Sequence, residues 1–257
     1  MLIEQQIKQY RALNKWFQSP LGLFAAHEFA VNLESAQELL SGETLVQLGN
    51  CGDNIWLKKL KFAHQWIASP FALANKIQFE SELNHLPLSR NSIDCLVAPL
   101  TLEPFNNSIG LIDEIDRVLK PMGFVVLLCI NPWSLWGGAI KCGMLNCYRD
   151  RTIKMRTPLN LNRLFIQRGY RQVSLTNFCY LPPVNSASLI NKLTFLDEIG
   201  KMLWPYPSGF YCYIAQKYQL IQPSLFTRVI SSPMSDYQSP LQPVTSTASP
   251  LKTWSKK

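Results

Sequence analysis

The chain has 257 residues and a formal net charge of +8; 47% of its residues are hydrophobic and only 16% are charged. This composition excludes a disordered polar chain, because it offers ample apolar mass for a core and a charged share well below the ~25% usual for soluble domains. The length predicts one large domain, or one domain with short additions.

The sequence predicts neither a membrane span nor a secreted, disulfide-linked protein. The longest apolar stretch, 124–140, is interrupted by Asn131, Pro132 and Ser134, whereas a span needs roughly 20 mostly apolar residues. The N-terminal residues include Glu4 and no long apolar run, so no signal peptide is predicted. The seven Cys form no Cys-x-x-Cys pair and the three His lie far from them, so the spacing predicts no metal site and favours a reducing, cytoplasmic location.

Helical and strand-like patterns follow one another along the chain. Continuous apolar runs such as 93–98 and 124–130 are typical of strands covered on both faces. Strands that alternate with helices indicate crossover connections, so the predicted class is α/β with a mainly parallel sheet. In chain order we predict helix 5–17, helix 33–40, strand 45–48, strand 64–68, strand 76–79, strand 93–98, helix 108–120, strand 124–130, helix 159–168, strand 171–180, helix 189–203 and strand 210–218.

The composition changes near residue 221. Ser, Thr, Pro and Gln dominate from Gln222 onward, and such a segment buries too little apolar surface to offset its chain entropy. We therefore predict a folded domain over 1–220, with a helix within 1–20 packed on it, and a flexible, Ser/Pro-rich basic tail over 221–257.

The positive charge is concentrated in residues 141–171, which hold eight Lys and Arg against one Asp. A local basic segment on a near-neutral body predicts one contact surface for an anionic partner, such as a nucleic acid, a phosphorylated metabolite or an acidic lipid surface. A solvated basic face without a partner explains the same pattern.

The turn Gly49-Asn50-Cys51-Gly52-Asp53-Asn54 follows the first predicted strand. Gly allows positive φ and a close approach of ligand to backbone, and Asn and Asp tolerate the left-handed region better than most residues. The turn is therefore a candidate ligand-binding loop, although an ordinary strand-to-loop turn fits it equally well.

The stretch from Glu82 to Ile130 carries a more specific pattern: Glu82-Leu-Asn-His-Leu-Pro-Leu88, Ile93-Asp-Cys-Leu-Val-Ala98, Glu103, and a helix ending Arg117-Val-Leu-Lys-Pro-Met-Gly123. It resembles the class I S-adenosylmethionine-dependent methyltransferases, in particular the small type 11 group and a bacterial subgroup with a degenerate first motif. That group has Leu-Pro-Phe, Phe-Asp, Leu-Glu-His and Arg-Val-Leu-Lys-Pro-Gly-Gly at these places. The resemblance covers residues 45–131 and implies a doubly wound, mostly parallel seven-stranded sheet and methyl transfer from S-adenosylmethionine.

The resemblance also implies a cofactor site at the ends of the strands. In the family, the Gly-rich turn contacts the methionine part of the cofactor, an acid near the end of strand three contacts the adenine amine, and the residues after strand four wall the methyl-donor pocket. The cofactor residues so implied are Gly49, Asn50, Cys51, Gly52, Asp53, Glu82, Leu83, Pro99, Leu100 and Glu103. Two of these residues have an alternative interpretation without a ligand. Glu82 fits a solvated loop carboxylate, and Glu103 fits a capping or surface group.

The family's cofactor motifs are incomplete in this chain. Gln47 replaces an acid two residues before the first Gly, and strand two ends in Ala68, Ser69 or Pro70 where the family has an acid that binds the ribose. The helix after strand two is also missing, which suggests a sheet trimmed there. Each lost hydrogen bond to a carboxylate is worth roughly 1.5–3 kcal/mol, so the loss of one or both ribose bonds lowers affinity by about one to four orders of magnitude.

No catalytic side chain is predicted, because an activated sulfonium needs mainly alignment of donor and acceptor. His85 and Asp94 are conceivable general bases, but structural roles are favoured for both. Asn131, Trp133 and Trp136, after strand five, are candidate residues for binding the methyl acceptor, with packing of the domain's mouth as the alternative.

Two other functions stay open at this point. The degenerate Gly-rich turn favours a catalytically silent binding or scaffold protein with a methyltransferase fold, and the charge of 141–171 favours a nucleic-acid-binding protein. The sequence indicates neither the acceptor nor the oligomeric state.

Overall fold

The computed structural model describes residues 3–71, 78–105, 108–148, 153–184 and 207–218, together with a few positions between 186 and 199. The predicted tail, most of the predicted helix 189–203, and Arg149 and Arg151 of the basic segment lie outside these residues. Among the helices described, none has both the length and the apolar character of a membrane span.

A seven-stranded sheet forms the centre of the domain, in the order β3-β2-β1-β4-β5-β7-β6. Only β7 runs against its neighbours β5 and β6, and the other pairs are parallel, which confirms the predicted α/β class. The sequence suggested a sheet trimmed at strand two, but β2 has six residues and the short strand is β3, with three. The strands are β1 Thr44–Leu48, β2 His64–Ser69, β3 Gln78–Glu80, β4 Ile93–Pro99, β5 Leu119–Ile130, β6 Tyr170–Phe178 and β7 Phe210–Lys217.

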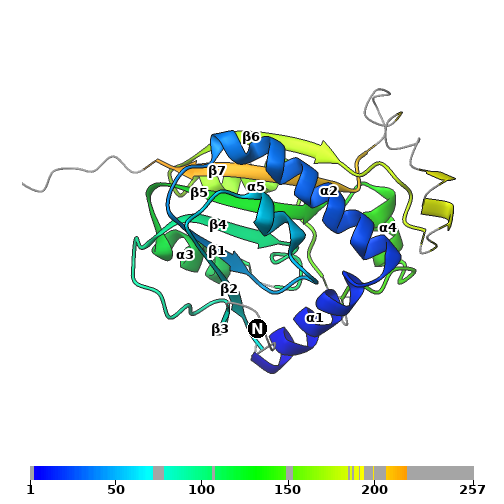
Figure 1. Cartoon of the computed structure of the whole chain (residues 1–257), viewed down its shortest axis with the longest axis horizontal. Helices are drawn as coiled ribbons and strands as arrows, with labels where there is room; N and C mark the ends of the chain where they lie inside the picture. The colour runs from blue at the N-terminus through cyan, green and yellow to red at the C-terminus, as the bar shows by residue number, and fades with distance from the viewer. Residues whose placement is uncertain are drawn as a thin grey trace, which may run out of the picture. The chain divides into compact units, whose positions relative to one another are not determined.

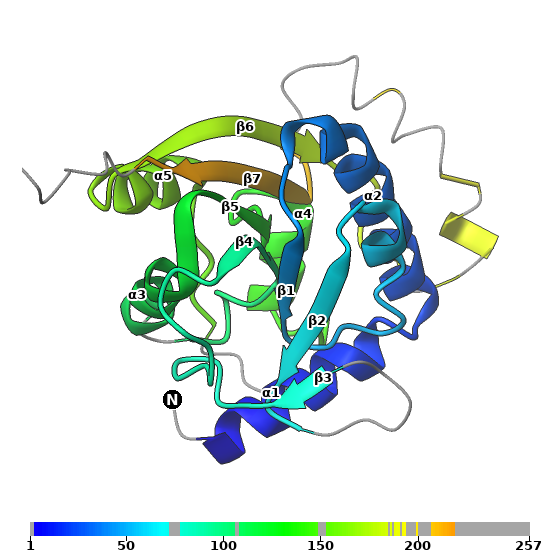
Figure 2. The ribbon, with the colours of Figure 1, turned by 60° about the vertical axis from the view of Figure 1, so that its left-hand side comes forward.

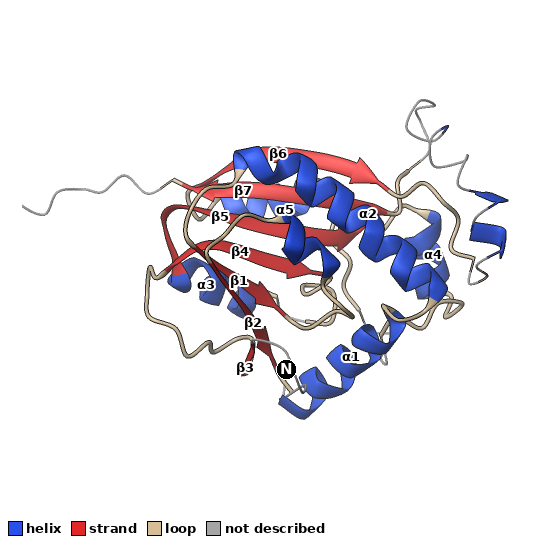
Figure 3. Ribbon diagram, in the orientation of Figure 1, coloured by secondary structure: helices blue, strands red, loops and turns tan. Residues whose placement is uncertain are grey.

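Helices cover both faces of this sheet. Figure 2 shows α2 on one side and α3 and α5 on the other, and Figure 3 shows α2 lying across the near face. The α-helices are α1 Ile3–Trp16, α2 Pro20–Ala36, α3 Ile109–Val118, α4 Leu135–Lys141 and α5 Pro158–Ile166, and two 3₁₀ helices are η1 Gln37–Leu39 and η2 Ile55–Lys59.

Two helices differ from the sequence-based prediction. α2 begins at Pro20 rather than at Leu33, with Ser19 as its N-cap: the Ser19 hydroxyl accepts a hydrogen bond from the Gly22 amide at 3.1 Å. α4 was not predicted, because its seven residues contain the pair Gly137-Gly138, which disfavours a helix.

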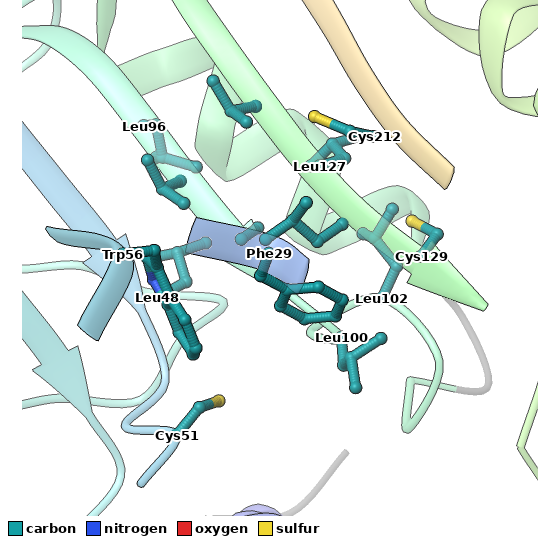
Figure 4. Packing of buried hydrophobic residues seen from close by; sticks show 14 of the residues in the cluster. Phe29, Leu48, Cys51, Trp56, Leu96, Leu100, Leu102, Leu127, Cys129 and Cys212 are labelled. Carbon is teal, nitrogen blue, oxygen red and sulfur yellow. The ribbon is translucent and has the colours of Figure 1, made fainter. Parts of the chain in front are cut away.

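Aromatic side chains join α2 to the sheet. The Phe29 ring lies 5.7 Å from Trp56, 5.4 Å from Phe178 and 5.3 Å from Phe210, within the range of favourable ring contacts. Figure 4 shows Phe29 and Trp56 among the leucines of this core, with Cys51 nearby. α2 therefore anchors the start of the chain to its last two strands.

Candidate functional site

The candidate cofactor residues lie at the carboxyl ends of the parallel strands, the edge where open α/β sheets bind ligands. Gly49 follows β1, Glu82 lies two residues after β3, and Glu103 lies four residues after β4. α1 runs across this edge (Figure 1). The structure thus brings Gly49, Glu82 and Glu103 to one rim of the sheet.

The Gly-rich turn keeps an unusual backbone despite its altered sequence. Gly49 and Gly52 have φ values of +81° and +58°, and Asn54 has φ +48°. The Asn54 amide closes the turn: its Oδ1 accepts from the Cys51 amide at 3.0 Å, and its Nδ2 donates to Asn50 Oδ1 at 2.8 Å. Side-chain hydrogen bonds of Asn54 therefore hold this loop in shape.

Gln47, at the position of the missing acid, braces this turn. Its Nε2 donates to the Gly49 carbonyl at 2.8 Å and to Asn54 Oδ1 at 2.6 Å, while its Oε1 accepts from Trp56 Nε1 at 2.8 Å. Both ends of the buried carboxamide face protein groups, so Gln47 positions the loop instead of reaching toward a ligand.

α1 meets the end of β3 through Gln6, whose side chain is fully buried. Gln6 Nε2 donates to Glu82 Oε1 at 3.3 Å and to Asn84 Oδ1 at 3.0 Å. Gln6 Oε1 accepts from the Leu83 backbone amide at 3.1 Å. Glu82 is therefore a half-buried loop carboxylate that α1 holds by a hydrogen bond.

Further along the same helix, Tyr10 and Asn14 meet the ends of β1 and β4. The Tyr10 hydroxyl donates to the Thr101 carbonyl at 3.2 Å. Asn14 Oδ1 accepts from the Gly52 amide and from Asn50 Nδ2, both at 2.8 Å. The sequence predicted only a packing role for this helix; the available signal was three polar residues, Gln6, Tyr10 and Asn14, which are spaced by four and share one helix face.

The end of β2 offers no acid to a ribose. The Ser69 hydroxyl donates to the Phe71 carbonyl at 2.8 Å, and the Ala68 carbonyl accepts from the Gly49 amide at 2.8 Å. The Arg11 guanidinium of α1 lies 5.6 Å from the centre of the Phe71 ring. The end of β2 is thus buried, with the Ser69 hydroxyl bonded to the backbone and the Arg11 guanidinium over Phe71.

Pro99 and Leu100 form a buried wall beside the turn. The Cys51 thiol donates to the Pro99 carbonyl at 3.8 Å, and the Tyr148 hydroxyl donates to the Leu100 carbonyl at 3.0 Å. Leu100 has φ +50°, a strained value for a branched residue. Asp53, at the outer side of the turn, is exposed.

Glu103 is buried, so its interpretation as a surface group is wrong. Its Oε1 accepts from the Ile130 amide at 3.0 Å, whereas Oε2 has no hydrogen-bond partner among the described residues other than the nearby Cys129 thiol, a weak donor. Burial raises the pKa of Glu103 to about 7, against the lowering effect of the Ile130 amide. The site therefore contains a carboxyl group that titrates near neutrality.

The three residues proposed for the methyl acceptor do not form one pocket. Trp136 is 1% exposed and its Nε1 donates to the Leu181 carbonyl at 2.7 Å, so it belongs to the core. Trp133 is 79% exposed and lines an open hollow of about 460 Å³ beside α4. Asn131 Oδ1 accepts from the Trp133 amide at 3.1 Å and shapes the turn between β5 and α4.

The two residues considered as general bases, His85 and Asp94, lie in different parts of the fold. Asp94 lies near the amino end of β4, at the opposite edge of the sheet, where it binds Lys120 Nζ at 2.7 Å and the amides of Glu43 and Thr44. Its position rules it out as a base for this site. His85 is an exposed residue of the loop after β3.

The basic segment is spread over several elements, and part of its charge is already bonded. Arg168 pairs with Asp113 at 2.6 Å and Arg156 Nε donates to the Ser108 hydroxyl at 3.0 Å. The other cations that the structure describes there are exposed, namely Lys141, Lys154, Arg163 and Arg171. An anionic partner for this segment stays a prediction.

Comparison with known proteins agrees with this architecture. Residues 51–127 match the family model described as "Methyltransferase domain". The chain is 32% identical over 96 residues to "Uncharacterized methyltransferase YodH" of Bacillus subtilis, covering 34% of this chain and 38% of that protein. It is 27% identical over 162 residues to "Uncharacterized protein YafS" of Escherichia coli, covering 63% and 62%. The chain thus spans less than two thirds of the length of either relative.

Solved structures share the fold at low identity. A Thermotoga maritima protein described as a SAM-dependent methyltransferase, possible histamine N-methyltransferase, superposes with a TM-score of 0.54 at 13% identity, covering 79% of this chain and 93% of that one. A SAM-dependent methyltransferase from Archaeoglobus fulgidus gives 0.52 at 17% identity, covering 73% and 92%. The chain thus shares its fold with solved SAM-dependent methyltransferases, and residues 51–127 match a methyltransferase domain in sequence.

Proposed function

We propose that this chain binds S-adenosylmethionine at the carboxyl edge of the sheet, between the Gly49 turn and Glu82, and transfers its methyl group to an acceptor. The cofactor is that of the class I family. The observation that carries the proposal is the placement of Gly49, Glu82 and Leu83 along one edge, under a single helix.

The groups at this edge fit the two ends of the cofactor. Glu82 and the Leu83 amide offer an acceptor beside a donor, the pair that binds the adenine amine and a ring nitrogen. Gly49 has no side chain, which lets another group approach its backbone closely; in the structure that group is the Tyr10 ring, because a Cβ at Gly49 would lie 2.6 Å from Tyr10 Cε1. The ribose finds no carboxylate at Ser69, so we expect weaker binding than in family members that keep that acid.

Methyl transfer at this edge depends on alignment more than on a reactive side chain. The bound cofactor supplies the activated methyl group. Pro99 and Leu100 form an apolar wall next to the turn, which excludes water from the donor side. Glu103 is the buried titratable carboxyl group closest along the chain to this wall, and it stays protonated in part near pH 7.

Titration of the full chain with S-adenosylhomocysteine tests the proposal. The variant Glu82→Gln should weaken binding about tenfold, because it removes a charge-assisted hydrogen bond to the adenine amine. The measurement is best made in a Gln6→Ala background, where α1 no longer bonds Glu82. Glu80→Gln, two residues away and exposed on β3, is the matched control and should leave the Kd unchanged.

Two results would contradict the proposal. One is equal affinity in the Glu82→Gln and Glu80→Gln proteins, which would place the cofactor elsewhere. The other is no binding in any variant, including those with altered α1, which would identify a silent protein with a methyltransferase fold.

A further inference from the structure

The face that α1 turns to the sheet is unusually polar at its two ends. Gln6 is fully buried, and Asn14 is half-buried against the turn after β1. Burying a carboxamide costs free energy unless it is hydrogen-bonded, so a helix that only covered a core would use apolar residues there. Gln6, Tyr10 and Asn14 are spaced by four and therefore lie in a row along the helix.

The Gln6 carboxamide makes the same hydrogen bonds that an adenine would make at this position. A carboxamide presents an NH₂ donor next to an oxygen acceptor, and adenine presents its exocyclic amine next to a ring-nitrogen acceptor. Gln6 Nε2 donates to Glu82 Oε1, and Gln6 Oε1 accepts from the Leu83 amide. Both protein groups that would recognise the base are thus bonded to α1.

At the other end, Tyr10 and Asn14 cover the Gly-rich turn. A Cβ at Gly49 would lie 2.6 Å from Tyr10 Cε1, so the Tyr10 ring occupies the space that this glycine leaves open. Asn14 Oδ1 accepts from the Gly52 amide and from Asn50 Nδ2, donors that face outward from the turn. Three successive turns of one helix therefore fill the site from its adenine end to its methionine end.

We propose that α1 is an intramolecular occupant of the cofactor site, with Gln6 in the place of adenine, and that the cofactor binds only after α1 has moved away. The identity of the site rests on the proposed function. Because only the open fraction of molecules can bind, the apparent Kd exceeds the intrinsic Kd by the inverse of that fraction. α1 is then a device that keeps the enzyme unloaded until something displaces the helix.

Variants of α1 separate this arrangement from a lid that closes over bound cofactor. Gln6→Ala and Asn14→Ala should each lower the Kd for S-adenosylhomocysteine by about tenfold, because each removes hydrogen bonds that hold the closed helix. Gln5→Ala is the matched control: it changes the same residue type one position away, on the exposed side of α1, and should leave the Kd unchanged. A lid that contacts the cofactor predicts the opposite sign, with weaker binding in Gln6→Ala.

Hydrogen–deuterium exchange on the unmodified protein provides a second test that needs no variant. Saturating S-adenosylhomocysteine should increase amide exchange in residues 3–16 and decrease it around 82–83. Protection of both segments by ligand, or equal Kd values for Gln6→Ala and Gln5→Ala, would overturn the displacement model while leaving the proposed function intact. Absence of binding even to a Gln6→Ala/Asn14→Ala double variant would overturn both.

Discussion

Met122 has a backbone φ of +65°, although the methyltransferase pattern that this stretch resembles has glycine at this place. A side chain in the left-handed region costs roughly 1–2 kcal/mol, while glycine costs about 0.5–1 kcal/mol in chain entropy. The Met122 side chain is half exposed, so it contributes little packing. Met122→Gly should therefore raise the free energy of unfolding by about 0.5–1 kcal/mol, measured as a higher urea midpoint. Met144→Gly, at a more exposed methionine without positive φ, should give no gain.

Glu103 predicts a pH dependence of stability that differs from that of the other carboxylates. Burial raises the pKa of Glu103 to about 7, so the folded state holds a proton that the unfolded state loses above about pH 4.5. The free energy of unfolding should fall as pH rises from about 4.5 to 7, by on the order of 3 kcal/mol.

The variant Glu103→Gln isolates this effect, because its amide oxygen can still accept from Ile130. The difference in unfolding free energy between the two proteins should change across pH 4.5 to 7 and be flat above it. Asp94 contributes in the opposite direction. Burial raises its pKa, but the hydrogen bonds from Lys120 and two backbone amides lower it by more, so the net pKa is below its usual value. Its contribution to the free energy of unfolding is therefore lost at low pH. A difference that does not vary between pH 4.5 and 7 would show that Glu103 is ionised in the folded protein.

At the level of elements, α3 fixes the loop that carries Glu82. Arg117 binds both carboxylate oxygens of Glu114, at 2.8 and 2.7 Å, and donates to the carbonyls of Leu88 and Leu86. Glu114 in turn accepts from the Leu86 amide at 2.6 Å. The Arg of the family's Arg-Val-Leu-Lys pattern thus ties the helix to the loop between β3 and β4.

Arg117→Lys should loosen this loop, because an ammonium group cannot form the planar two-point contact and reach two carbonyls as well. We expect a loss of about 1–3 kcal/mol and faster amide exchange in residues 82–92. Arg163→Lys on α5 is the control, since that side chain is exposed. Unchanged exchange in the loop would mean that Glu114 and the backbone suffice to hold it.

The elements that could be predicted from the sequence are those whose pattern of apolar residues is distinctive along the chain. β4 and β5 are continuous apolar runs because both of their faces are covered, and α3 has a clear amphipathic period. α2 carries no such period, because apolar residues lie on most of its sides, including the exposed Leu23 and Val31, so only its last residues were assigned to a helix.

For the whole molecule, the topology of a parallel sheet sufficed to place Gly49 and Glu82 at one edge, since the carboxyl ends of parallel strands meet there. The role of α1 could not be predicted. Gln6 bonds residues more than 70 positions away, and no local pattern encodes such a contact. Asp94, for which a structural role was favoured, lies near the start of a parallel strand and therefore at the edge opposite the candidate site.

The contacts of Phe29 set the order in which the molecule can be completed during synthesis. Its partners Phe178 and Phe210 belong to the last two strands, so α2 leaves the ribosome long before they exist. Until then, the ring contacts of Phe29 that the structure describes are those with Phe17 and Trp56. Pairing of such distant segments is slow because the intervening chain must first be ordered. A nascent chain that stops before β7 therefore exposes the apolar face of α2 around Phe29, and chaperones bind exposed apolar surfaces of this kind.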